Sequence, residues 1–240
     1  MSNTTIKIQD TLNWVAAFVQ QRPTTGVAGI PNEPGLTAAN KVMQSILAPP
    51  FKWSWNRKED STLTCTAGTT DYAVSLSDWG FLEKAYGTLA SNDPPVFEIE
   101  VAQVLSKESK ENRPQKIAPI TDDNNGTITF RLLPAPDKAY VITLEYQKAA
   151  ILVSSVGATW APIPDRYAFL YEAGLLAYMQ GIYSAQLYMA NMQIFFRQLV
   201  GAAEGLTATE KAIFLEDQLR ILRTQSNSAM DAAQGKQVRL

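Results

Sequence analysis

The spacing of apolar residues changes twice along the chain. At 11–21 and 36–47 apolar side chains recur every three or four residues, which predicts two short amphipathic helices. Apolar and polar residues then alternate in short segments between turn residues, which is typical of β-strands. The segments expected to form strands are 51–57, 62–66, 71–76, 81–90, 96–105, 127–133 and 140–146. Of these, 62–66 and 71–76 are expected to pair with each other around a turn at 67–70. Helical spacing returns from Pro164 nearly to the end, so we predict an α+β protein with a β module inserted between helices.

Three helices are expected in the last third of the chain. Pro164 and Asp165 suit the first turn of one helix, and a second is predicted at 184–203. Thr207 and Glu210 have the spacing of a capping box and should begin a third helix that extends toward residue 232.

The pattern also predicts how the chain is divided. We expect residues 1–50 and 163–230 to form a helical bundle, 51–162 an antiparallel β-sandwich or barrel, and 231–240 a basic tail. Residues 106–126 carry alternating charges without an apolar face, so we predict a long solvated loop. A loop of this length is either functional, by contact with a partner, or disordered. An Asn125-Gly126 hairpin turn should precede the strand at 127–133.

Composition narrows the classes of function. Charged residues make up only 18% of the chain and hydrophobic residues 46%, which suggests that much of the surface is covered, most simply by other copies of the chain. The net charge of -2 provides no basic field for a sequence-reading DNA-binding protein. The first residues lack a basic segment followed by an apolar one, so we expect no signal peptide.

Candidate catalytic chemistry is scarce. The chain has no histidine, which excludes Ser-His and Cys-His nucleophiles and imidazole metal sites. Its single cysteine, Cys65, lies in a strand-like segment with no base nearby and is interpreted as structural. No glycine-rich phosphate loop is present, and the spacing of Asp122 to Gly126 does not fit a calcium loop. We therefore predict no catalytic, metal or cofactor site.

Residues 173–196 contain no charge. A membrane span is disfavoured because polar side chains occur on every face of this segment. The segment could be a helical hairpin buried in its own core, or a helix pair that neighbouring subunits also cover. Its tyrosines and methionines favour the second interpretation. The candidate subunit-interface residues are Tyr178, Tyr183, Tyr188, Met189 and Met192.

Three tryptophans, Trp53, Trp55 and Trp79, could stack on bases or sugars. Base stacking in nucleic-acid grooves is normally accompanied by stripes of Lys and Arg, which these residues lack. A place in the core or at a domain junction is therefore favoured, with a carbohydrate-binding module as an alternative.

Three motifs in order resemble one known family. The first is Trp53-Ser54-Trp55-Asn56-Arg57 after a helix that ends in Ala48-Pro49-Pro50. The second is Gly68-Thr69-Thr70-Asp71-Tyr72 leading to Leu76-Ser77-Asp78-Trp79-Gly80. The third is Ile163-Pro164-Asp165-Arg166-Tyr167 before an Ala/Tyr/Leu-rich helix. Together they resemble the head-to-tail adaptor proteins of tailed bacteriophages, also called connectors or tail-tube gatekeepers, over about residues 8 to 225.

The resemblance implies a structural virion protein at the neck, assembled in the host cytoplasm as a ring of twelve copies below the capsid portal. A helical bundle would surround a channel through which DNA passes without specific binding, and the β module would face the tail tube or nozzle protein. A near-neutral chain suits such a conduit, because each phosphate contact would add affinity and friction. By position, the C-terminal residues that would reach the portal are Lys236, Gln237, Val238, Arg239 and Leu240.

Other interpretations remain open at this point. A tail terminator or other tail protein is usually dominated by β-structure, whereas this chain has a long helical third. A carbohydrate-binding module would need exposed tryptophans. A hydrolase using carboxylates such as Asp71 and Asp78 has little support, because nothing in the sequence marks either as perturbed.

Overall fold

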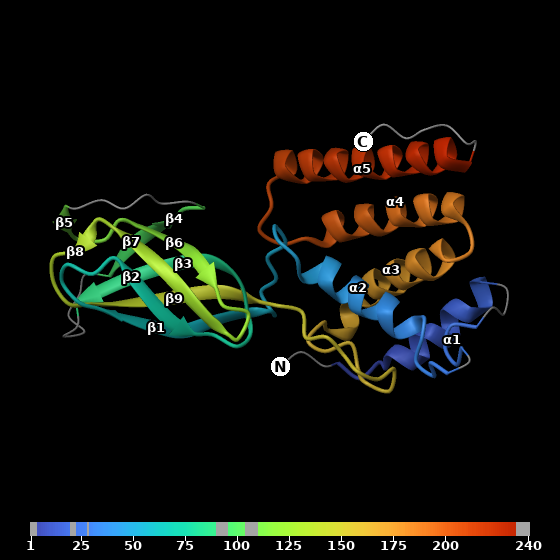
Figure 1. Cartoon of the computed structure of the whole chain (residues 1–240), viewed down its shortest axis with the longest axis horizontal. Helices are drawn as coiled ribbons and strands as arrows, with labels where there is room; N and C mark the ends of the chain where they lie inside the picture. Colours follow the sequence, from blue (N-terminus) through green and yellow to red (C-terminus); the bar gives the residue numbers. More distant parts are fainter. Residues whose placement is uncertain (1–3, 20–22, 28, 90–95, 104–109, 234–240) are drawn as a thin grey trace. The chain divides into compact units, whose positions relative to one another are not determined.

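A computed structural model describes residues 4–19, 23–27, 29–89, 96–103 and 110–233 of the 240-residue chain (Figure 1). The chain separates into two units. Met1–Trp55 and Ile151–Leu240 form the first, which we call the helical unit, and Asn56–Ala150 form the second, the β unit. The predicted α+β class is confirmed.

The helical unit is arranged around one central helix. Its elements are α1 (Ile8–Phe18), α2 (Gly35–Leu47), the 3-10 turn η1 (Asp165–Tyr167), α3 (Ala168–Gly181), α4 (Ala185–Ala202) and α5 (Ala208–Ala233). The helix α3 packs against α1, α2 and α4, whereas α5 has its main helix contacts with α4 (Figure 1). The expected bundle is therefore not confirmed, because α5 lies outside the group of helices that surrounds α3.

Local hydrogen bonds explain where the helices begin. The Asp10 carboxylate accepts the Lys7 N–H at 3.3 Å, so α1 starts three residues earlier than the sequence predicts. The Ser184 hydroxyl accepts the Leu187 N–H at 3.4 Å and caps α4. The predicted capping box before α5 is confirmed, since the Thr207 N–H donates to Glu210 and the Glu210 N–H donates back to the Thr207 hydroxyl.

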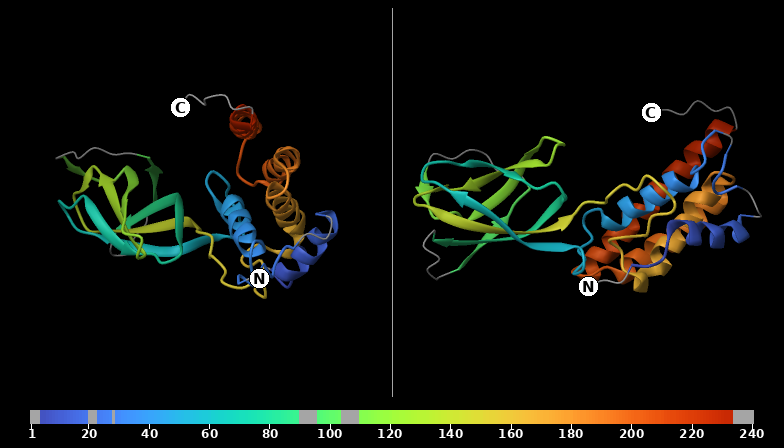
Figure 2. Two further views of the ribbon diagram at one scale, coloured as in Figure 1. Left: turned by 45° about the vertical axis from the view of Figure 1, so that its right-hand side comes forward. Right: turned by 90° about the horizontal axis from the view of Figure 1, so that it is seen from below.

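The β unit contains one curled seven-stranded sheet (Figure 2). Its strands follow the order β1-β9-β3-β4-β6-β7-β2. Their bounds are β1 Arg57–Cys65, β2 Asp71–Ser75, β3 Trp79–Leu89, β4 Phe97–Val101, β6 Lys116–Asp122, β7 Thr127–Leu133 and β9 Tyr140–Lys148. A separate parallel pair is formed by β5 (Glu111–Asn112) and β8 (Ala135–Pro136).

Side chains from all seven strands of the sheet meet in a single core, which includes Leu63, Tyr72, Ile99 and Phe130. Cys65 lies in this core, fully buried. Burial raises the pKa of the Cys65 thiol to about 12, which keeps it in the unreactive thiol form near neutral pH. The structure thus supports the interpretation of Cys65 as a structural residue.

Two strand predictions are wrong. Residues 51–57 do not form a strand: Phe51 and Trp53 are buried, and residues 54–56 form a turn before β1. The Trp53 indole N–H donates to the Ile46 carbonyl at 2.7 Å, so this alternating segment is held by α2 rather than by a sheet. The segments predicted at 62–66 and 71–76 are strands, but they do not pair with each other: β1 pairs with β9, and β2 pairs with β7.

The predicted loop at 106–126 and the purely antiparallel module also need correction. Lys116–Asp122 form β6, which is antiparallel to β7 and parallel to β4. Ile117 and Ala118 are buried, so this short apolar run outweighs the charges around it. The predicted Asn-Gly turn is present between β6 and β7, and such a turn requires a strand on each side.

Candidate assembly surface

The helix α3 has an unusual distribution of apolar residues. Its apolar residues are spread around its circumference rather than gathered in one stripe, a pattern typical of a helix covered on most sides. On one of its sides the packing is tight: a Cβ added at Gly174 would lie 2.9 Å from Val42 Cγ1 of α2 and 3.0 Å from Phe195 Cε2 of α4. With α1, α2 and α4 against it, α3 still has an open side.

A groove runs along this open side of α3. We call it the α3 groove. It is lined by Trp14 of α1, by Phe169, Glu172, Ala173 and Leu176 of α3, and by Asn191, Ile194 and Gln198 of α4. The α3 residues have the spacing i, i+3, i+4 and i+7 of a single helical stripe. Trp14 is 42% exposed and Ile194 48%, so large apolar side chains line the groove and face solvent.

Two polar groups give the α3 groove its chemical character. Glu172 is the one charged residue among those that line it. The Gln198 side-chain oxygen is buried and has no hydrogen-bond partner within the part of the chain that the structure describes. A buried acceptor without a partner costs free energy, about 1–3 kcal/mol. The groove therefore offers an apolar surface, one carboxylate and one acceptor that lacks a donor.

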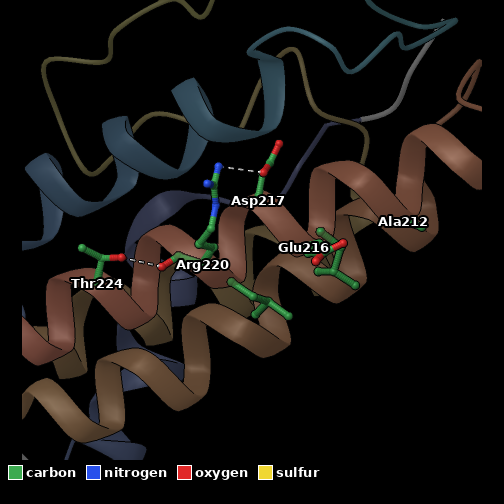
Figure 3. A pocket seen from close by; sticks show the side chains of 7 residues that line it. Ala212, Glu216, Asp217, Arg220 and Thr224 are labelled. Atoms are coloured by element: carbon green, nitrogen blue, oxygen red, sulfur yellow. Dashed lines mark hydrogen bonds and ion pairs between the residues drawn. The ribbon is translucent and has the colours of Figure 1, made fainter.

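A second surface lies on α5. Among the α5 side chains whose burial is described, only Leu222 is buried. Ile213 is 57% exposed and Ile221 46%. Figure 3 shows the side chains around a shallow pocket on this helix, where Arg220 donates to Asp217 at 3.0 Å and the Thr224 hydroxyl donates to the Arg220 carbonyl at 3.0 Å. Two large apolar side chains of α5, Ile213 and Ile221, are thus left without cover by the described part of the chain.

A third groove lies between α2 and the C-terminal end of α3. Tyr178 of α3 and Ile182, which directly follows α3, line it together with Thr37 and Lys41 of α2. The Lys41 ammonium group lies 5.9 Å from the centre of the Tyr178 ring, within the range of a cation–π contact.

A comparison with protein families identifies the chain. The model of the SU10 adaptor protein family, a family of phage head-to-tail adaptors, matches residues 30–234. The protein belongs to this family. No curated protein matches the chain. The adaptor is thus a structural protein of a phage, and its family implies a place at the neck of the virion.

The interface residues predicted for the adaptor are found in different environments. Tyr178 and Tyr188 lie together, with ring centres 6.2 Å apart, and both are half-buried, as is Met189. The Tyr183 hydroxyl donates to the Pro23 carbonyl at 3.1 Å. Met192 is buried inside the protomer, so its side chain adds almost nothing to the free surface.

The C-terminal candidates, residues 236–240, lie outside the described residues. Sequence reasoning missed Trp14, Phe169 and Ile194, which form the most exposed apolar part of the α3 groove. The helical spacing of Phe169, Ala173 and Leu176 could have been recognised in the sequence. A helical stripe alone, however, does not reveal whether the protein's own core covers it.

The structure does not support the two alternatives based on these residues, sugar binding by the tryptophans and hydrolysis by Asp71 and Asp78. Trp53 is fully buried, and Trp79 packs on Phe130 and Tyr146 in the β unit, so these rings do not form an exposed sugar platform. Asp71 is held by the Arg131 guanidinium at 2.7 Å. Burial acts to raise the pKa of Asp78, but hydrogen bonds from Tyr146 and Lys58 and the Lys58 charge outweigh it and lower that pKa, the opposite of a catalytic acid.

Within the described residues, no group of three or more potential ligands could hold a metal ion. A membrane-crossing helix, long and apolar enough, is likewise not found in the described part of the chain.

Proposed function

We propose that this adaptor forms a ring of twelve copies that joins the capsid portal to the tail and leaves a channel for DNA. The observation that carries the proposal is the presence of two different uncovered apolar surfaces, the α3 groove and α5, on one protomer. A contact between two unlike surfaces repeats from copy to copy and forms a ring when the rotation closes. Large exposed apolar patches on soluble proteins mark such contacts.

The near-neutral net charge of the chain supports the proposal of a DNA channel. A protein that neutralises many phosphates binds DNA tightly, which would slow DNA during packaging and ejection. The net charge of -2 is spread over a chain with 21 basic and 23 acidic residues, so the ring as a whole does not attract DNA. DNA then passes without sequence-specific contacts.

The partners follow from this place in the virion. The portal protein lies on one side of the ring and the tail tube or nozzle protein on the other, with the β unit toward the tail. Tyr178, Tyr183, Tyr188 and Met189 contribute to the subunit contact, and residues 236–240 reach the portal. Assembly takes place in the host cytoplasm, before the neck is complete.

Mixing the full-length chain with the portal protein of the same virus tests this proposal. We expect native mass spectrometry to find a complex whose mass equals that of the portal plus twelve adaptor chains. Trp14→Arg should greatly reduce the number of bound chains because it places a charge in the α3 groove. Val96→Arg, at an apolar residue of the β unit that is even more exposed than Trp14, should leave the number unchanged. Absence of any complex with the unmodified chain would contradict the proposal.

A further inference from the structure

We infer that the α3 groove of one copy receives α5 of a neighbouring copy. In this arrangement the open side of α3 is covered only in the assembled protein. The inference rests on the proposed function, because it requires a second copy beside the first.

The groove has the form of a site for a helix. Three helices already pack on α3, and the groove on its open side has walls from α1 and α4 and a floor formed by one stripe of α3. Amphipathic helices bind in grooves of this kind through one face, whose residues recur at spacings such as i, i+3, i+4, i+7 and i+8. A single further helix would complete the cover of α3 and bury Trp14, Phe169 and Ile194.

The helix α5 carries the matching residues. Ile213, Arg220 and Ile221 have the spacing i, i+7 and i+8 and lie on its exposed side. The two isoleucines are about 12 Å apart along the helix axis. Leu222 lies on the opposite, buried side, where α5 packs on α4 of its own chain. The exposed side of α5 therefore faces away from its own α4, and the helix that it can cover belongs to another copy.

The polar groups of the two surfaces complement each other. Arg220 has five N–H donors, enough to pair with the Glu172 carboxylate and to donate to the Gln198 oxygen that lacks a partner. Its present ion pair with Asp217 lies on the open surface and is weak, so exchanging it costs little. The Trp14 indole N–H and the Gln198 amide can then donate to Asp217. The α3 groove and the exposed side of α5 thus each supply hydrogen-bonding groups that the other surface lacks.

The two surfaces differ from each other, so every copy uses its groove for one neighbour and its α5 for the next. This is the heterologous contact that a ring needs. The grooved side and α5 are separated by α4, which contributes Ile194 and Gln198 to the groove and also packs on α5. Binding at one surface leaves the other free for the next copy.

Cysteine pairing between two populations of chains tests the inference. Cys65 is the only cysteine and is buried, so introduced cysteines are the reactive ones. Full-length chains with Ile194→Cys and chains with Ile221→Cys are mixed, assembled on the portal protein and oxidised. We expect a covalent adaptor dimer from this mixture and none from either variant alone. Ile151→Cys, at an exposed isoleucine of the helical unit that lines neither the α3 groove nor the groove between α2 and α3, is the control and should not pair with Ile221→Cys.

Charge reversal provides a second test that does not depend on oxidation. Glu172→Arg and Arg220→Glu should each reduce ring assembly at least tenfold. The chain that carries both changes should recover most of it, because residue 172 of one copy meets residue 220 of the next. Circular dichroism of each variant confirms that the fold is retained.

The outcomes separate the inference from the proposed function. If the unmodified chain assembles on the portal but the 194–221 dimer is absent, or the 151–221 dimer forms equally well, the inference is wrong and the ring stands. A crosslink from residue 194 to the portal protein would also overturn it, because the groove would then hold the portal. If the unmodified chain does not assemble at all, the proposed function fails.

Discussion

The indole ring of Trp160 lies flat on the phenol ring of Tyr171, with the ring centres 4.5 Å apart and the planes 5° apart. The Trp160 indole N–H also donates to the Thr11 hydroxyl at 2.9 Å, in the interior of the helical unit. Trp160 therefore holds α1 against α3. Because Trp14 lies on the same α1, this contact also fixes one wall of the α3 groove.

The Tyr171 hydroxyl leads to a first prediction. It is buried and has no hydrogen-bond partner among the described residues, and burial raises the pKa of Tyr171. Tyr171→Phe should therefore be neutral or should stabilise the protein by up to about 1 kcal/mol, because the stacked ring is kept and a buried unpaired group is removed. Trp160→Phe, which loses the bond to Thr11, should cost about 1–3 kcal/mol. Urea unfolding followed by far-UV circular dichroism compares the two, and a loss of more than about 1 kcal/mol in Tyr171→Phe would contradict the assignment.

Two glycines of the helical unit should respond in opposite ways to alanine. A Cβ at Gly174 would lie within 3.0 Å of side-chain carbons of Val42 and Phe195, so Gly174→Ala should overpack the core and cost about 1–3 kcal/mol. Gly201 of α4 has open space around it, and alanine there should stabilise the helix by about 0.5 kcal/mol. Thermal unfolding of both variants measures the difference. Equal effects would show that α2, α3 and α4 are packed less closely than described.

The ion pairs of the β unit should differ in importance according to the burial of the acid. Arg57 donates twice to Glu83, at 2.7 and 3.0 Å, and the Glu83 side chain is only 5% exposed. Arg57→Met should cost about 2–4 kcal/mol because it leaves a buried carboxylate without its counter-charge. Arg131→Met leaves Asp71, which is 29% exposed and remains hydrated, and should cost about 1 kcal/mol or less. Chemical denaturation measures the unfolding free energy of both variants. A larger loss of stability in Arg131→Met than in Arg57→Met would contradict this prediction.

Glu204 predicts a pH dependence of stability. Burial acts to raise its pKa, but hydrogen bonds from the Ser54 N–H at 2.8 Å and the Tyr167 hydroxyl at 2.9 Å, among others, outweigh burial and lower the pKa of Glu204 below 4.5. A carboxylate with a lowered folded-state pKa stabilises the protein above its unfolded-state pKa, and this stabilisation is lost as the pH falls through the folded-state pKa.

The matching variant is Glu204→Gln, which cannot accept both bonds. It should be less stable than the unmodified chain near neutral pH, and the difference in unfolding free energy should shrink as the pH falls below 4.5. Denaturant titrations at a series of pH values measure this difference. A difference that stays constant into the acid range would rule out the proposed role of the carboxylate.

Much of the fold could be read from local patterns. The helical spacing after Pro164, the Thr207–Glu210 capping box and the Asn-Gly turn before β7 all depend on residues close in sequence, and each prediction is confirmed. The order of strands in the sheet could not be predicted from the sequence. The pairing of β1 with β9 and the parallel pairing of β4 with β6 depend on partners distant in sequence. The strand β6 was missed because Pro119 and the surrounding charges hide a short apolar run.

The candidate surface was predicted only in part, for a physical reason. An uncharged helix pair indicates burial, but the pattern does not state whether the same chain or a neighbour provides the cover. Tyr178 and Tyr188 were proposed because tyrosines are common at interfaces, and their place in the subunit contact stays a prediction. Trp14 and Ile194 emerge only when the fold places α1 and α4 on either side of α3.

Electron cryomicroscopy of the virion neck tests the central claim most directly. The account predicts a ring of twelve adaptor chains between the portal and the tail, with α5 of each copy in the α3 groove of the next. Density for this chain elsewhere in the virion, or no such ring at the neck, would contradict it.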